Sequence, residues 1–184
     1  MTYEEFNQLI ERVEENGESA LTADEMEKLA PYKVDNAIIM AAGYSARCMP
    51  LSNVLPKGLF RVKGDVLIER EIRQLLEAGV KEIIVVTGFM SEKFQYLQEK
   101  YGVILIHNED YDKYNNMASL YAAQKYMKNS YILCSDNYYV DNVFHAYVYS
   151  SYYSCVYSDS YCDEFCVLEE DTEGYISNIH RGGA

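Results

Sequence analysis

The 184-residue sequence has little positive charge and no long apolar segment. It carries 16 lysine and arginine residues against 29 acidic ones, a formal net charge of −13 at pH 7. Such a chain repels nucleic acid at long range. No run approaches the roughly 20 apolar residues that a membrane helix needs. The first residues are acidic and amphipathic, unlike a secretory signal. We therefore expect a cytoplasmic protein that binds neither nucleic acid nor membrane.

Cysteine is sparse, and its spacing matches no common motif. The five residues include no Cys-x-x-Cys pair: Cys48, Cys134, Cys155, Cys162 and Cys166. An odd number without paired spacing favours reduced thiols over a disulfide framework. A zinc site at the last two cysteines would need histidine ligands, but the three histidines are scattered along the chain. The sequence therefore argues against a structural zinc site.

Two parts of unequal size are predicted. Residues 1–33 have the pattern of two short amphipathic helices, and two capping boxes mark their starts, Thr2 with Glu5 and Thr22 with Glu25. We expect this segment to be a small helical extension, because it is too short to hold a core of its own. Residues 34–184 are expected to form the main domain.

In the main domain, apolar runs alternate with amphipathic segments. Strands are predicted at 37–42, 82–87, 103–106 and 131–134, and helices at about 66–78, after Ser91 and at about 117–127. This order predicts an α/β fold with a mostly parallel sheet and right-handed crossovers. Residues 165–168 and 175–179 predict an antiparallel hairpin near the C-terminus. Ligands of such sheets bind beyond the carboxyl ends of the strands.

The loop after the first predicted strand has features suited to phosphate. It contains small residues around Gly43 and two cations, Arg47 and Lys57, but it is neither a P-loop nor a GxGxxG turn. Small residues let main-chain N–H groups approach a triphosphate, and the cations would neutralise phosphate oxygens. A surface loop with two ordinary cations has the same spacing, and spacing alone favours that plainer interpretation.

Three segments carry a resemblance to a known family. AIIMAAGYSARCMPLSNVLPKGL resembles the glycine-rich loop of the sugar-phosphate nucleotidyltransferase superfamily. YDKYNNMASLYAA and YILCSDNYYV are similar to bacterial CTP:phosphocholine cytidylyltransferases. The resemblance begins at about Asn36 and leaves the first 33 residues outside. It implies a Rossmann-like three-layer nucleotidyltransferase fold and the Mg²⁺-dependent transfer of CMP from CTP to phosphocholine, with release of pyrophosphate.

The resemblance also implies roles for single residues. The residues that it implies bind the nucleotide are Ala42, Gly43, Ser45, Asn115, Asn116, Ser119 and Asn137. The catalytic cations are Arg47 and Lys57, and the metal ligand is Asp136, whose alternative role is to cap the turn after its strand. Because the attacking phosphate is already an anion, such a site needs positioning and charge neutralisation rather than a strong base.

Choline selectivity requires aromatic faces beside a carboxylate. The candidates are Tyr138, Glu164 and Phe165, although relatives commonly have tryptophan where Phe165 stands. Phe165 serves equally well as a core strand residue. A sugar-1-phosphate nucleotidyltransferase and a non-catalytic nucleotide-binding module remain the alternatives.

Family members continue beyond the length of this chain. The resemblance therefore implies that a C-terminal part, with a second metal-binding aspartate, is missing here, either because the sequence is a fragment or because the chain is a degenerate relative. We expect turnover by these 184 residues to be weak or absent. Because some relatives carry a fused choline kinase, a fused or partner choline kinase is a further expectation.

Overall fold

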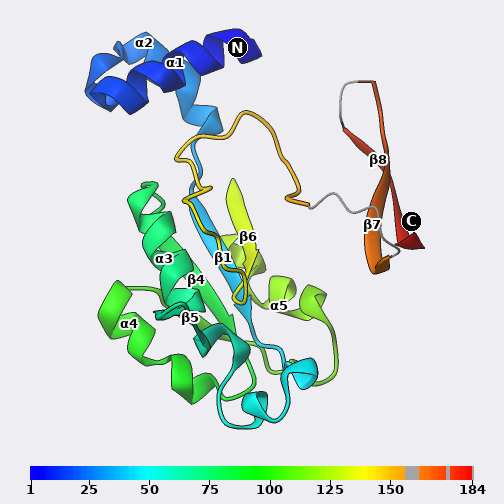
Figure 1. Cartoon of the computed structure of the whole chain (residues 1–184). Coiled ribbons are helices and arrows are strands. Elements are labelled where there is room, and N and C mark those ends of the chain that lie inside the picture. The colour runs from blue at the N-terminus through cyan, green and yellow to red at the C-terminus, as the bar shows by residue number, and fades with distance from the viewer. Residues whose placement is uncertain (156–161, 173–174, 184) are drawn as a thin grey trace. The chain divides into compact units, whose positions relative to one another are not determined.

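The computed structural model describes residues 1–155, 162–172 and 175–183. The chain divides into two compact units, residues 1–150 and residues 151–184 (Figure 1). The first contains a parallel sheet with its helices, and the second contains an antiparallel strand pair.

A four-stranded parallel sheet forms the centre of the first unit. Its strands, in spatial order, are β5 (Ile104–His107), β4 (Glu82–Thr87), β1 (Asn36–Ala41) and β6 (Ser130–Cys134). The register places Asn36 of β1 opposite Glu82 on one side and Ser130 on the other. All four strands coincide with the predicted apolar runs to within one residue at either end. The predicted α/β fold with a mostly parallel sheet is confirmed.

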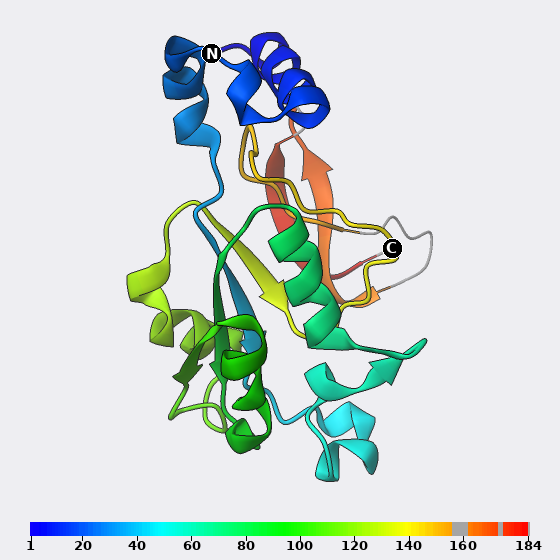
Figure 2. The ribbon, with the colours of Figure 1, turned by 90° about the vertical axis from the view of Figure 1, so that its left-hand side faces the viewer.

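Helices cover both faces of this sheet. The larger apolar cluster joins Ile39 of β1 to Ile68 and Ile72 of α3 (Leu67–Glu77), and it also includes Leu97 of α4 (Tyr96–Tyr101). Ile38, the neighbouring β1 residue, belongs to a second cluster next to α5 (Asn116–Ala122). Successive strand residues point to opposite faces, so the sheet is the middle of three layers. Figure 2 shows α3 and α5 on opposite sides of it.

The two predicted N-terminal helices are confirmed. α1 (Tyr3–Asn16) and α2 (Ala23–Leu29) each begin with the predicted capping box, and the 3₁₀ turns η1 (Glu18–Ala20) and η2 (Ala30–Tyr32) follow them. Phe6 and Leu29 pack with Tyr147, which lies far along the chain. Arg12 of α1 forms an ion pair with Glu25 of α2, with 2.6 Å between nitrogen and oxygen. These contacts place both helices in the same compact unit as the sheet.

The segment between β1 and α3, predicted as a plain loop, has local structure of its own. It contains the 3₁₀ turns η3 (Ala46–Cys48), η4 (Leu51–Asn53) and η5 (Lys57–Leu59), then a short hairpin of β2 (Arg61–Val62) and β3 (Asp65–Val66). Such short turns are stabilised by contacts with the rest of the fold. They have no repeating apolar pattern, so hydrophobic periodicity in the sequence does not predict them.

Two predicted helices are shorter than expected. Ser91 provides no side-chain cap, and the segment starts as the 3₁₀ turn η6 (Ser91–Phe94) after a left-handed residue, Met90, with φ of 51°. The helix predicted to reach residue 127 ends at Ala122 and continues as η7 (Gln124–Tyr126). The N–H of Ala123 is shared between the carbonyls of Ser119 and Leu120, which tightens the last turn.

The second unit confirms the predicted hairpin. β7 (Cys162–Glu170) and β8 (Ile176–Gly183) are antiparallel and longer than the sequence predicts. The N–H of Tyr175 donates to Asp171 at 2.9 Å, which closes the turn. In the part of the chain that the structure describes, no helix is both long and apolar enough to span a membrane.

Candidate functional site

The segments that follow the four parallel strands meet at one edge of the sheet. Three main-chain hydrogen bonds connect neighbouring segments there: Ser135 N to Met40 O, Phe89 N to Ala42 O, and Asn108 N to Thr87 O. The sequence predicted that ligand-binding residues would gather at this edge. The structure brings the loop after β1 and the turn after β6 together there, and with them a lysine and an aspartate from distant parts of the chain.

Lys57 and Asp136 form an ion pair at this edge. Lys57 begins η5, and Asp136 lies two residues after β6. The ammonium of Lys57 nevertheless donates a hydrogen bond to the carboxylate of Asp136. The side chains are 39% and 30% exposed, so solvent and ligands can reach both. This hydrogen bond raises the pKa of Lys57, and the lysine stays charged at neutral pH. A predicted catalytic cation therefore contacts the predicted metal ligand.

Gly58 explains how Lys57 comes so near. A Cβ at Gly58 would lie 2.7 Å from the hydroxyl oxygen of Ser135 and 3.1 Å from its carbonyl oxygen. Only glycine therefore permits η5 to pack closely on the turn that carries Asp136. The next residues toward the N-terminus, Pro56 and Lys57, are held beside that turn as a consequence.

The rest of the loop after β1 surrounds this pair more loosely. Arg47 lies exposed in η3, and its charge reaches Lys57, where it acts to lower the pKa against the effect of Asp136. Ser45 precedes η3 in the left-handed region, with φ of 52°. Gly43 is exposed, with no atom within 4 Å of the position a Cβ would occupy. Ala42 is buried, and its carbonyl accepts from the N–H of Phe89.

The three residues predicted to lie near the base occupy different environments. Asn115 caps α5, where its side chain accepts from the N–H of Met117 at 3.2 Å, and Asn116 is exposed in the first turn. Ser119 is only 4% exposed and accepts a 3.2 Å hydrogen bond from the amide of Asn108. Ser119 therefore connects α5 to the segment after β5, whereas the two asparagines face outward.

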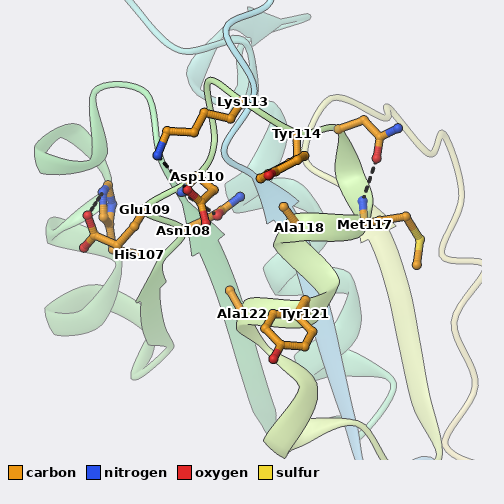
Figure 3. A pocket seen from close by; sticks show the side chains of 11 residues that line it. His107, Asn108, Glu109, Asp110, Lys113, Tyr114, Met117, Ala118, Tyr121 and Ala122 are labelled. Carbon is orange, nitrogen blue, oxygen red and sulfur yellow. Dashed lines mark hydrogen bonds and ion pairs between the residues drawn. The ribbon is translucent and has the colours of Figure 1, made fainter.

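A cavity of about 760 Å³ lies beside Asn115. Figure 3 shows it between α5, which contributes Ala118 and Tyr121, and the end of β5, where His107 closes the strand and Asn108 follows it. Tyr114 and Met117 also line it, and Lys113 points toward Asp110, with which it pairs at 2.8 Å. Aromatic rings and amides are suited to a flat polar ring. Of the residues predicted to bind nucleotide, only Asn115 lines this cavity.

A buried carboxyl lies close to Asp136 and is absent from the predicted site. Glu71 of α3 is fully buried, and neither of its oxygens has a hydrogen-bond partner. Burial and the negative charge of Asp136 raise its pKa to about 9, which the nearby N–H of Asn137 only partly opposes. Glu71 is therefore neutral at pH 7. Its spacing from Ile68 and Leu75 placed it on the apolar face of the helix, which is the sequence signal for its burial.

The turn after Asp136 is held down by α3. Arg70 donates to the carbonyls of Tyr139 at 2.7 Å and Val140 at 2.5 Å. Its guanidinium lies 4.7 Å from the ring centroid of Tyr138, and the ammonium of Lys63 lies 5.7 Å from it. Tyr138, predicted to contact the acceptor's ammonium, therefore already has two cations on its ring. The side chain of Asn137 donates to the hydroxyl of Tyr139 at 3.1 Å.

Two predicted acceptor residues belong to the second unit. Glu164 and Phe165 lie in β7, where the structure describes the main chain only. Their side chains are outside the described residues.

The acids of this edge do not form a dedicated metal cage. Within the described ranges, no group of three or more histidine, cysteine, aspartate or glutamate side chains is arranged to hold a metal. Asp136 is a partly exposed hard oxygen donor. Such a single carboxylate fits a cation whose other ligands are phosphate oxygens and water, the usual arrangement for Mg²⁺ with nucleotides.

Comparisons with known proteins agree with this geometry. A family model described as a MobA-like NTP transferase domain matches residues 37–160. A choline-phosphate cytidylyltransferase from Streptococcus pneumoniae is 44% identical over 108 residues, which is 59% of this chain and 47% of that protein. A 2-aminoethylphosphonate cytidylyltransferase from Lancefieldella rimae is 48% identical over 89 residues, 48% of this chain and 36% of that protein.

A solved structure extends the similarity to the fold. The CTP:phosphocholine cytidylyltransferase of Streptococcus pneumoniae superposes with a TM-score of 0.76 and 38% identity, over 81% of this chain and 64% of that one. The predicted nucleotidyltransferase fold is thus confirmed. The chain spans about half or less of the length of the two curated relatives described above.

Proposed function

This chain belongs to the family of MobA-like NTP transferase domains, and from that premise we propose that it transfers CMP from CTP to phosphocholine, giving CDP-choline and pyrophosphate. The predicted resemblance to nucleotidyltransferases is confirmed by the family match and by the relatives. Relatives that are choline-phosphate cytidylyltransferases include one from Streptococcus pneumoniae and one from Haemophilus influenzae. Their shared activity supports the choice of substrates.

The contact between Lys57 and Asp136 is the observation that carries this proposal. In the reaction, an oxygen of the acceptor's phosphate attacks the α-phosphorus of CTP, a new P–O bond forms, and pyrophosphate leaves with its electron pair. The attacking oxygen is already anionic, so no side chain must remove a proton. Lys57 and Arg47 would bind the phosphate oxygens and neutralise the charge that moves to pyrophosphate. Arg47 is exposed and the Lys57 side chain is 39% exposed, so a phosphate can reach both.

Asp136 is proposed as the protein's ligand to Mg²⁺. When bound, the cation would orient the triphosphate and add positive charge beside it. Asp136 contributes one carboxylate at the end of β6, and the main-chain bond from Ser135 to Met40 fixes the turn that holds it. The remaining ligands would come from phosphate oxygens and water.

The nucleoside is proposed to lie across the ends of β1 and β5. Ala42, Gly43 and Ser45 would contact phosphates and sugar, because the open space beside Gly43 lets a ligand approach its main chain. The base would enter the cavity at the start of α5. Asn115 and Asn116 are exposed there, and Ser119 would act by holding Asn108 in place.

Tyr138, Glu164 and Phe165 are each proposed to contact the acceptor, and Asn137, which follows the metal ligand in sequence, is proposed to contact the nucleotide. An aromatic ring and a carboxylate suit a trimethylammonium group. The cations already beside Tyr138 favour a phosphate neighbour over an ammonium at that ring.

We also propose a role in choline metabolism in the cytoplasm, with a choline kinase as a fused or separate partner. Residues 1–33 are proposed to form a helical extension that is separate from catalysis.

A second candidate acceptor is 2-aminoethylphosphonate, on which a relative 48% identical over 89 residues acts. Both acceptors present an anionic phosphorus group and a cationic nitrogen, so the same loop would serve either. Glu164 and Phe165 are the residues expected to choose between a trimethylated and a primary ammonium.

Pyrophosphate release tests the proposal. The chain is incubated with Mg²⁺ and CTP plus phosphocholine, CTP plus 2-aminoethylphosphonate, or UTP or dTTP plus a hexose 1-phosphate. Turnover with phosphocholine above the other acceptors supports the proposal, and turnover with hexose phosphate alone refutes it. Calorimetry with CTP and Mg²⁺ gives a second readout, since Asp136→Asn should then weaken binding only when Mg²⁺ is present. CTP binding without turnover on any acceptor would instead support the non-catalytic nucleotide-binding module.

A further inference from the structure

Lys57 is hydrogen-bonded to the carboxylate of Asp136, which the proposed reaction requires as a metal ligand. Its ammonium bonds Oδ2 of Asp136. Both side chains have been given other partners above, phosphate for the lysine and a divalent cation for the aspartate. The pair must therefore open before both partners can bind.

We propose that the Lys57 ammonium is a placeholder for the divalent cation at Asp136, so that lysine and metal compete for one carboxylate until the phosphates of a nucleotide draw the lysine away. This inference rests on the proposed function, because it assumes that Asp136 binds the metal. It adds a binding order: metal alone binds poorly, and metal with nucleotide binds well.

Lys57 is the partner that can move. Its four-carbon stem is flexible, and 39% of the side chain is exposed. Asp136 lies in a turn anchored on one side to β1 through Ser135 and on the other to α3 through Arg70. A bound phosphate can therefore pull the ammonium outward while the carboxylate stays in place.

The neighbouring groups favour this exchange. The charge of Arg47 repels the Lys57 ammonium, and the hydrogen bond to Asp136 is the strongest interaction that favours its charged form. A second carboxyl close to Asp136, that of Glu71, is fully buried in α3 and therefore is not at the surface with the ammonium. Phosphate oxygens bound beside Arg47 would attract Lys57 away from Asp136, leaving the carboxylate to the cation.

Mn²⁺ binding to the full chain without nucleotide tests the inference, by electron paramagnetic resonance of the free ion or by calorimetry. Replacing Lys57 with methionine removes the competing ammonium, so Mn²⁺ should bind about fivefold more tightly, the upper range for a partly exposed ion pair. In Lys57→Met, CTP binding in the presence of a chelator should weaken. A higher affinity for Mn²⁺ together with a lower affinity for CTP is the result expected if Lys57 acts as a placeholder.

Matched variants separate this effect from general electrostatics. Lys63→Met removes one positive charge from the same part of the chain without touching the pair, and should leave Mn²⁺ affinity near that of the wild type. Lys57→Arg keeps a competing cation and should also bind Mn²⁺ weakly. Thermal melts followed by circular dichroism check folding, and Lys57→Gln takes the place of the methionine variant should that variant not fold.

The outcomes distinguish the inference from the function beneath it. If Asp136→Asn abolishes Mn²⁺ binding while Lys57→Met leaves it unchanged or weaker, the placeholder is overturned and the metal role of Asp136 stands. If Lys63→Met strengthens Mn²⁺ binding as much as Lys57→Met does, the competition is not specific and the inference is again overturned. If Asp136→Asn has no effect on Mn²⁺, the metal role itself fails, and the inference with it.

Discussion

Gly58 packs against Ser135 so closely that a Cβ on the glycine would overlap the serine, at 2.7 Å from Oγ and 2.9 Å from its Cβ. This approach joins the loop after β1 to the turn after β6. It brings a lysine to an aspartate 79 residues away in sequence. The candidate site therefore depends on a contact between two small residues that belong to neither the catalytic nor the binding set.

Gly58→Ala should damage both stability and the site. The added methyl group forces η5 away from the turn, which costs about 1–3 kcal/mol of unfolding free energy, and Lys57 loses its place beside Asp136. Thermal unfolding and CTP calorimetry measure the two effects. Gly43→Ala is the control for stability, because nothing lies within 4 Å of the position of its Cβ. Equal melting temperatures for the two variants would contradict the packing argument.

The strands were predictable because the sequence encodes them locally. Residues such as Ile38 and Val85 belong to continuous apolar runs, as strands covered on both faces require. The spatial order of the strands and the turns η3 to η5 could not be predicted, because each depends on residues far away in the chain. Gly58 is an example. In the sequence it is one glycine among ten, and only its close contact with Ser135 in the fold explains why a glycine is required there.

The site shows the same division. The motifs singled out Lys57 and Asp136 as candidates, because their residue types and their positions after strands can be recognised in the sequence. They gave no indication that Tyr138 would have Arg70 and Lys63 beside its ring, since that depends on how α3 packs against the turn. The predicted role of Ser119 stays untested, and its buried bond to Asn108 could only be found in the fold.

Ser119→Ala should reveal whether that serine holds the proposed base pocket together. The substitution removes the acceptor of a buried 3.2 Å hydrogen bond from Asn108, which costs about 1–2 kcal/mol of stability. CTP affinity should fall by a smaller factor, because the pocket loses order rather than a direct contact. Urea unfolding and calorimetry measure both, with exposed Asn116→Ala as the control for stability alone. A large loss of CTP affinity at unchanged stability would instead assign Ser119 a direct contact.

Arg70→Met should loosen the turn that carries Asp136. Arg70 bonds two carbonyls of this turn and forms an ion pair with Asp65 at 3.0 Å. Losing these partly buried, charge-assisted bonds should cost about 2–3 kcal/mol. Hydrogen exchange of the main-chain amides at residues 136–142 should accelerate more than exchange in β1 or β4. Arg61→Met, at an exposed position in the β2–β3 hairpin, is the control. Uniform exchange changes would contradict a local role.

Glu71 makes the stability of the fold depend on pH in an unusual direction. In the folded chain burial and Asp136 raise its pKa from 4.5 to about 9. The unfolded chain releases this proton near pH 4.5, and the folded chain keeps it. Folded chains therefore bind the proton more strongly, so unfolding becomes easier as pH rises from about 4.5 to about 9. By pH 7 the loss is on the order of 3 kcal/mol.

Glu71→Gln removes this dependence while keeping the shape of the side chain. Below pH 4.5 the glutamate carries its proton in both states, and the two proteins should differ only by a constant. Between pH 4.5 and 9 the free energy of unfolding of the wild type should fall relative to that of the variant, and above pH 9 the difference should level off. Urea unfolding at pH 5, 7 and 9 measures it. Glu77→Gln, on the exposed side of the same helix, should show no such trend, and parallel curves for wild type and Glu71→Gln would mean that the buried carboxyl titrates normally.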